Sequence, residues 1–140
     1  MGWIGWALLS AVFAAATAIL AKIGIAGVNS NLATALRTTV VVIFAWAVAF
    51  ATTPMSGIRS ISPKTALFLT LSGLATGLSW LCYFRALQLG PASAVAPLDK
   101  LSVVLVVIFA ALFLNETLTP ARIIAATLIA AGALVLALHP

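Results

Sequence analysis

The chain has 140 residues, of which 64% are hydrophobic and 6% are charged, and its formal net charge is +5. Soluble domains carry about 25% charged residues, so this composition excludes a soluble globular protein and indicates a membrane protein. The basic residues are scattered singly, which argues against nucleic acid as a partner, and the lone Cys82 excludes a cysteine-rich metal site.

Five apolar segments follow one another along the chain, and each has about the 20 residues that a helix needs to cross a bilayer. No alternating barrel pattern is present, so helices are the expected spans. We therefore predict an all-α fold, a polytopic membrane helix bundle in a single domain over residues 1–140. The predicted transmembrane helices cover residues 3–21, 32–51, 65–87, 93–114 and 121–138.

The first segment begins with Trp3 and Trp6, which we expect to anchor it at the membrane interface. It is unlike a cleaved signal peptide, because no Lys or Arg precedes it and the first basic residue, Lys22, follows it. The connections are too short to hold a folded domain. They include Gly90-Pro91 and Thr119-Pro120, the second of which predicts a proline at the start of the last helix.

The fourth segment contains Asp99 and Lys100 within its apolar run. A charged side chain at the centre of a membrane helix costs about 2.5–3.5 kcal/mol, and it usually marks a functional site. Neighbours in sequence point about 100° apart on a helix, so we expect no good ion pair between these two residues. Arg85 or Arg37 is then the expected partner of Asp99, while Lys100 would face a cavity, a carbonyl group or an anionic ligand.

Pro97 precedes this pair by one turn and lacks the backbone N–H group. We expect it to disturb the preceding turn, as irregular backbone does where it lines a polar cavity inside a membrane protein. Pro97 and the charged pair together indicate a polar cavity that holds a substrate.

Four basic residues and one acidic residue are expected in the same half of the bilayer, because the spans alternate in direction. Their net charge is +3, which favours neutral, zwitterionic or anionic ligands. The candidate substrate-binding or coupling residues are Asp99, Lys100, Arg85, Arg37, Lys22, Trp80 and Tyr83. Other readings stay open: the long basic side chains can snorkel to the lipid headgroups, Asp99 can form a structural salt bridge between helices, and Trp80 and Tyr83 can serve in packing.

An odd number of spans puts the two termini on opposite sides of the membrane. One side has Arg59, Lys64 and Arg122, and the other has Lys22 and Arg85, with two more basic residues inside helices. This near balance only slightly favours an N-terminus inside. It permits insertion in both directions, which would allow dual topology and an antiparallel homodimer.

Three stretches resemble one repeat of the EamA-like branch of the drug/metabolite transporter superfamily. They are Tyr83-Phe84-Arg85-Ala86-Leu87, Pro91-Ala92-Ser93-Ala94-Val95-Ala96-Pro97-Leu98, and Phe113-Leu114-Asn115-Glu116-Thr117-Leu118-Thr119. Asn115 stands where that family usually has glycine, Glu116 matches its acidic position and Gly132 its late glycine. The resemblance covers nearly the whole chain.

Typical members have ten helices in two inverted five-helix repeats, and this chain looks like a single repeat. The resemblance implies that two copies assemble around a midplane site and work by alternating access. It implies a half-size secondary transporter that exports small metabolites, located in the bacterial inner membrane. The first helix lacks the acidic residue that related four-helix exporters use to bind cationic drugs, which argues against that substrate class.

The alternative function is a non-transporting membrane subunit, or one half of a hetero-oligomeric transporter. We do not expect an enzyme, because the sequence has no His cluster, no carboxylate pair and no nucleophile beside a base. For the same reason we expect no metal and no cofactor. His139 is expected to be an interfacial or terminal residue. The expected partners are a small-molecule substrate, the lipid bilayer and a second copy of the chain.

Overall fold

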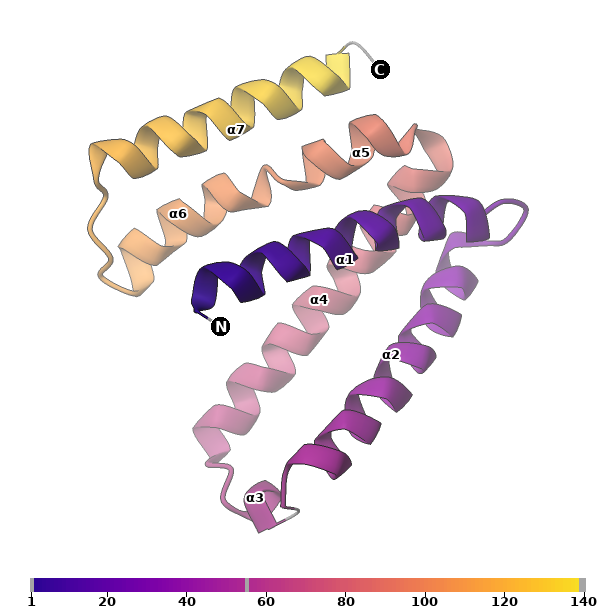
Figure 1. Cartoon of the computed structure of the whole chain (residues 1–140), viewed down its shortest axis with the longest axis vertical. Coiled ribbons are helices and arrows are strands. Elements are labelled where there is room, and N and C mark those ends of the chain that lie inside the picture. Colours follow the sequence, from indigo (N-terminus) through magenta and orange to yellow (C-terminus); the bar gives the residue numbers. More distant parts are fainter. Residues whose placement is uncertain (1, 55, 139–140) are drawn as a thin grey trace. The chain divides into compact units, whose positions relative to one another are not determined.

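The computed structural model describes residues 2–54 and 56–138, and all regular structure in those residues is helical (Figure 1). His139 lies outside the described residues. Five stretches are long and apolar enough to span a membrane, and α5 and α6 together make the fourth. The predicted fold class, an all-α polytopic membrane protein with five spans, is confirmed. The helices are α1 (Trp3–Gly24), α2 (Ser30–Thr52), α3 (Ser56–Arg59), α4 (Pro63–Leu89), α5 (Ala92–Asp99), α6 (Ser102–Phe113) and α7 (Pro120–Leu138).

Each long span begins within two residues of its predicted start, and capping side chains explain the two largest differences, at α2 and α4. The Asn29 side chain accepts hydrogen bonds from the backbone N–H groups of Asn31, at 2.9 Å, and Leu32, at 3.4 Å. This cap lets α2 begin at Ser30, inside the segment that the sequence placed in a loop. Ser62 does the same for α4, because its hydroxyl accepts from the Thr65 N–H at 3.1 Å.

Threonine hydroxyls within the spans are bonded back to the helix. Thr34 donates to the Ser30 carbonyl at 2.8 Å, and Thr38 donates to the Thr34 carbonyl at 2.7 Å. A hydroxyl without a partner in hydrocarbon costs several kcal/mol, roughly 4–8 by transfer to an alkane, so these bonds make threonine tolerable inside a span.

The chain divides into two compact units, Met1–Ile23 with Ala86–Pro140, and Gly24–Arg85. In the first unit α7 packs along both α5 and α6 (Figure 1). Small side chains are buried there, Ala94 on α5 with Ala126 and Ala133 on α7, and they allow the close approach of helices on which membrane packing depends. In the second unit α2 and α4 are joined through the short α3.

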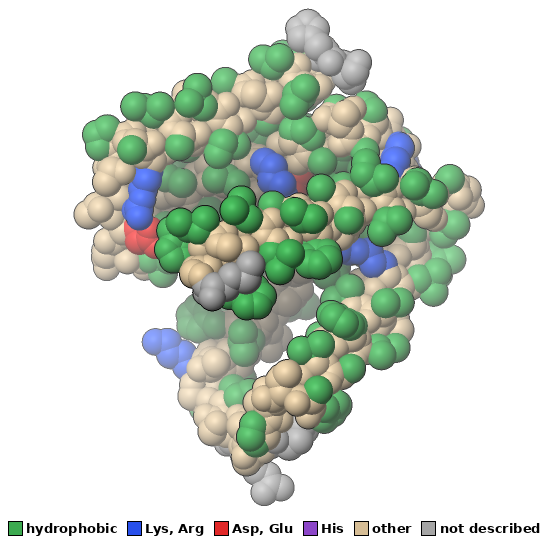
Figure 2. All heavy atoms as spheres, viewed as in Figure 1, with side chains coloured by type: hydrophobic (Ala, Val, Ile, Leu, Met, Phe, Trp, Pro, Cys, Tyr) green, Lys and Arg blue, Asp and Glu red, His purple; other side chains and the backbone are tan. Residues whose placement is uncertain are grey.

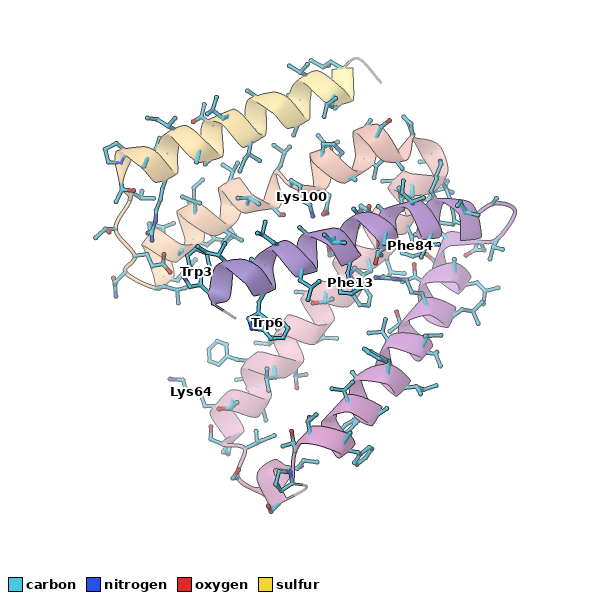
Figure 3. All side chains as sticks on the ribbon, in the orientation of Figure 1. Trp3, Trp6, Phe13, Lys64, Phe84 and Lys100 are labelled. Atoms are coloured by element: carbon cyan, nitrogen blue, oxygen red, sulfur yellow. The ribbon has the colours of Figure 1, made fainter. Side chains whose placement is uncertain are left out.

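Large apolar side chains are exposed along all the long helices, and many of them project from the face seen in Figure 2. Trp3 is 81% exposed and Trp6 is 61% exposed, and both project from the first two turns of α1 (Figure 3). A water-soluble protein would not tolerate so large an apolar surface. In a bilayer this surface faces lipid tails or a second protein chain.

Candidate substrate site

The fourth span is interrupted at Lys100 and Leu101, which separate α5 from α6 (Figure 3). The Lys100 N–H donates to the Pro97 carbonyl at 3.0 Å, and the Leu101 N–H donates to the Leu98 carbonyl at 3.1 Å. Both bonds join residues three apart, so the helix tightens from an α-helix to a 3₁₀ turn here. Such an irregular segment inside a helix often marks a functional position.

The interruption lies after Pro97, whereas we expected a disturbance in the turn before it. Pro97 itself fits within α5, since its fixed φ angle is compatible with a helix. The tight turn begins at the Pro97 carbonyl, which accepts from the N–H three residues on. It continues to Val104, whose N–H donates to the Leu101 carbonyl at 3.0 Å.

Asp99 and Lys100 form an ion pair in this turn, with 3.3 Å between Oδ2 and Nζ. The expectation that they could not pair is therefore wrong. It considered only the directions in which the two side chains leave the backbone, which are about 120° apart in a 3₁₀ turn, and it left out the length of the lysine side chain. The flexible lysine side chain reaches back to its neighbour.

The ion pair lies well inside the span and is still accessible. α5 has eight residues, so Asp99 lies about 10–12 Å along the helix axis from the start of the span. The Asp99 side chain is 38% exposed and that of Lys100 is 55% exposed. A polar ligand that reached this depth would meet a hydrogen-bond acceptor and an ammonium donor side by side.

Arg37 lies against aromatic rings in the second unit. Its Cζ atom is 4.4 Å from the centre of the Trp80 ring and 5.4 Å from that of Phe84. A guanidinium at these distances from a ring face is stabilised by the cation–π interaction. Arg37 is half-buried and Phe84 is buried, so these rings fix the position of the charge.

Phe84 was not among the residues expected at the site, although the sequence contained the signal. Trp80 and Phe84 are four residues apart and share one face of α4. Tyr83, which was expected there, packs its ring edge-on against Phe84 at 6.5 Å between centroids.

The chain has two acidic residues, and each forms an ion pair with a basic residue of its own unit. Asp99 pairs with Lys100, and Glu116 pairs with Arg122 at 3.2 Å. Residues 24–85 contain no Asp or Glu, so no carboxylate of its own unit offsets the charge of Arg37. The flat faces of the guanidinium suit the rings, and its edge carries N–H donors that suit a carboxylate.

Lys22 has a structural role. Its Nζ atom donates to the carbonyl oxygens of Leu87 and Gly90, the second at 2.8 Å. These carbonyls belong to the last turn of α4 and the residue beyond it, where helical partners are missing. A positive charge at this end of a helix is also favoured by the helix dipole. Lys22 thus holds the end of α1 to the turn between α4 and α5.

Arg85 is exposed on α4, one residue beyond Phe84. The structure therefore brings together Asp99 with Lys100, and Arg37 with Trp80, as two clusters within separate units. Among the residues that the structure describes, no group of three or more His, Cys, Asp or Glu side chains is placed to hold a metal ion.

Comparison with known proteins agrees with the resemblance found in the sequence. The EamA-like transporter family matches residues 1–138. A relative from Sinorhizobium sp., described as an uncharacterized transporter in the cobO 3'region, is 55% identical over 135 residues, which is 96% of each chain. No solved structure matches the chain. With this match over nearly its full length and five apolar spans, the chain belongs to the EamA-like transporter family.

Proposed function

We propose that this protein is a half-size secondary transporter that exports small anionic or zwitterionic metabolites. The interruption of the fourth span at Asp99 and Lys100 carries the proposal. Many secondary transporters bind their substrates between the halves of a broken membrane helix, where backbone groups and charges are available inside the bilayer. Asp99 and Lys100 would contact the substrate directly.

Arg37 supports the choice of substrate class. An arginine within a span needs an anion to offset its charge. The two acidic side chains of the chain already form ion pairs with Lys100 and Arg122. A substrate carboxylate would fit the edge of the guanidinium while Trp80 holds its face. The absence of acidic residues from α1 makes organic cations poor substrates.

The pairing of Asp99 with Lys100 gives a route to proton coupling. A substrate carboxylate that binds the Lys100 ammonium would compete with Asp99 for it. Asp99 would then be left without its partner inside the span, and we propose it as the residue that couples substrate binding to proton movement.

The working unit would be an antiparallel homodimer that alternates between two open states. Inverted repeats around a midplane site are a common design in secondary transporters, and two copies of opposite orientation would reproduce it. The similar length of the Sinorhizobium relative and its description as a transporter support a functional unit of this size. The nearly balanced Lys and Arg content of the two sides would allow both orientations.

A non-transporting subunit, or one half of a hetero-oligomer, is the alternative. The contacts of Lys22 favour this alternative function. Lys22 was predicted to bind substrate, but its ammonium donates to the backbone carbonyls of Leu87 and Gly90, which is a structural role. Purification as a stable homodimer with activity of its own would exclude the alternative.

Counterflow into proteoliposomes tests the proposal. Vesicles containing the purified protein are loaded with one unlabelled amino acid or monocarboxylate at a time and then given the labelled compound outside. We expect saturable exchange for at least one anionic or zwitterionic compound and none for ethidium, with protein-free vesicles as the control. Exchange of ethidium alone would overturn the substrate class, and exchange of no compound in the set would overturn transport by the homodimer.

A further inference from the structure

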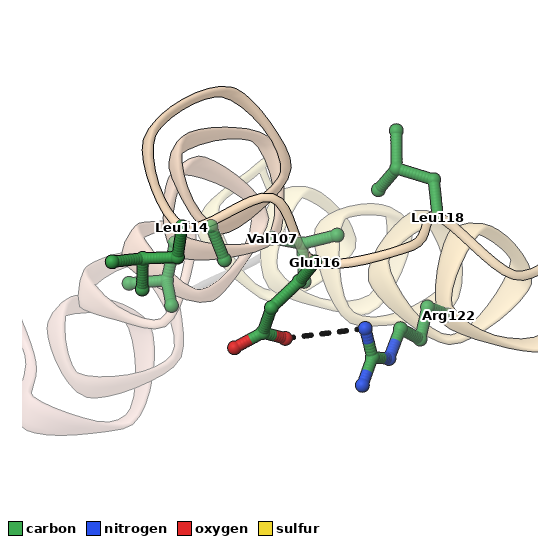
Figure 4. A pocket seen from close by; sticks show the side chains of 7 residues that line it. Val107, Leu114, Glu116, Leu118 and Arg122 are labelled. Atoms are coloured by element: carbon green, nitrogen blue, oxygen red, sulfur yellow. Dashed lines mark ion pairs between the residues drawn. The ribbon is translucent and has the colours of Figure 1, made fainter.

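The turn between α6 and α7 borders a cavity of about 260 Å³ within the first unit. Most of its wall is apolar, and its charged groups are Glu116 and Arg122, which form the ion pair in Figure 4. The lining residues are Val106, Val107, Ala110, Leu114, Glu116, Leu118 and Arg122.

The turn is built to hold these two charges in place. Asn115 has a φ of 54°, in the left-handed region, and the Glu116 N–H then donates to the Ala110 carbonyl at 3.2 Å. Beyond the turn, Thr119 accepts from the Arg122 N–H at 3.3 Å and so caps α7. The Arg122 Nη1 atom also donates to the Thr117 carbonyl at 2.9 Å.

The cavity extends from the end of two spans toward the interior of the bilayer. Residues 114–119 connect α6 to α7, so the ion pair lies at the level of the lipid headgroups. Val106 lies seven residues before the end of α6, which places it about 10 Å deeper along the helix. An amphiphile with a charged head and an apolar tail matches this gradient.

Both charged groups have free hydrogen-bonding capacity among the described residues. Arg122 makes its contacts there through Nη1, which leaves the donors on Nε and Nη2. Glu116 pairs through Oε2, which leaves Oε1. The two side chains are about half exposed, at 48% for Arg122 and 49% for Glu116.

We propose that this cavity binds a zwitterionic phospholipid with a primary ammonium headgroup, such as phosphatidylethanolamine. The phosphate lies against Arg122, because guanidinium groups bind phosphate with paired hydrogen bonds. The ammonium lies against Glu116. The apolar wall from Leu114 to Val106 takes the upper part of one acyl chain.

The same chemistry discriminates against other lipids. Phosphatidylglycerol offers no cation to Glu116, and its net negative charge meets that carboxylate. Phosphatidylcholine has a quaternary ammonium, which proteins recognise with aromatic cages, and none of the described residues lining the cavity is aromatic. Acyl chains are equally apolar in bulk lipid and in the cavity, so the headgroup contacts must supply the selectivity.

Native mass spectrometry of the detergent-purified protein tests the proposal. The protein is given equal amounts of phosphatidylethanolamine, phosphatidylglycerol and phosphatidylcholine with identical acyl chains. We expect phosphatidylethanolamine to be retained about fivefold over the other two, as charge-assisted hydrogen bonds allow. Glu116→Gln should remove this preference, and Lys64→Gln, which changes an exposed charge on the other unit, should keep it.

A second variant tests the contribution of the cavity independently of the ion pair. Ala110→Leu adds bulk to the wall and leaves both charged residues unchanged, and we expect it to lower phosphatidylethanolamine retention about threefold by steric exclusion from the filled wall. Equal retention of the three lipids by the unmodified protein would overturn the proposal. A preference that survives Glu116→Gln would overturn it as well. Neither result depends on whether the protein transports a metabolite.

Discussion

The guanidinium of Arg37 faces the ring of Trp80, with 4.4 Å between Cζ and the ring centre. This contact lies between α2 and α4 within one compact unit, so it fixes the charge through two helices. The ring contributes to holding a cation inside an apolar span without consuming the N–H donors at the edge of the guanidinium. We therefore expect the edge of the Arg37 guanidinium to be available to an anion, as the proposed substrate class requires.

Removing the ring should weaken substrate binding more than it weakens folding. For Trp80→Leu we expect the KM for an anionic substrate to rise about tenfold, since a desolvated cation–π contact contributes about 1–2 kcal/mol. Counterflow at varied substrate concentration measures this effect. Trp46→Leu, on α2 outside the Arg37 cluster, is the matched control. Equal KM values for the two variants would remove Arg37 and Trp80 from the site.

Replacing Pro97 tests whether the interruption matters for transport. Pro97→Ala restores an N–H group that can donate to the Ser93 carbonyl and should stiffen α5 up to the interruption, because proline within a helix costs about 3 kcal/mol. We expect a higher midpoint of thermal unfolding and slower counterflow. Pro63→Ala is the control, because Pro63 is the first residue of α4, where proline is well tolerated. Counterflow at the unmodified rate in a stabilised Pro97→Ala variant would contradict this role.

Lys22 should contribute to stability rather than to substrate recognition. Lys22→Met removes the donor to the Leu87 and Gly90 carbonyls, and we expect a loss of about 1–3 kcal/mol in the free energy of unfolding. Denaturation in mixed detergent micelles measures the change, with Lys64→Met as the exposed control. The KM of the folded Lys22→Met protein should be unchanged. A raised KM with unaltered stability would return Lys22 to the substrate site.

Asn115 should tolerate glycine and reject β-branched residues. Its φ of 54° lies in the left-handed region, which costs most L-residues about 1–2 kcal/mol and which glycine adopts freely. We expect Asn115→Gly to change the free energy of unfolding by less than about 1 kcal/mol and Asn115→Val to lower it by about 1–2 kcal/mol. Similar unfolding curves for the two variants would contradict the assigned backbone conformation.

The spans were predictable because the bilayer allows few alternatives. About 20 apolar residues in a row must form a helix, so hydropathy located all five spans. The ends were less predictable, because they depend on single caps such as the Asn29 side chain on α2. The backbone conformation of Asn115 could have been predicted from the sequence. The family resemblance places glycine at this position, and glycine and asparagine both suit a left-handed backbone.

The candidate site was only partly predictable from sequence. Two charges in an apolar run drew attention to Asp99 and Lys100, but their ion pair was missed because the reach of the flexible lysine side chain was not considered. Whether the backbone tightens after Pro97 depends on hydrogen bonds that hydropathy does not encode. The contacts of Lys22 were not predictable for a related reason, since its acceptors are backbone carbonyls 65 and 68 residues away in the chain.

Counterflow by a Lys100→Ala variant tests the central claim most directly. The comparison uses the unmodified protein and Lys64→Ala, which removes an equal charge from an exposed position at the start of α4. If Asp99 and Lys100 form the substrate site, Lys100→Ala should reduce exchange of the anionic substrate at least about tenfold, as expected for loss of a charge-assisted contact inside the span. Lys64→Ala should exchange at the unmodified rate. Full exchange by Lys100→Ala, together with full exchange by Asp99→Asn, would contradict the account.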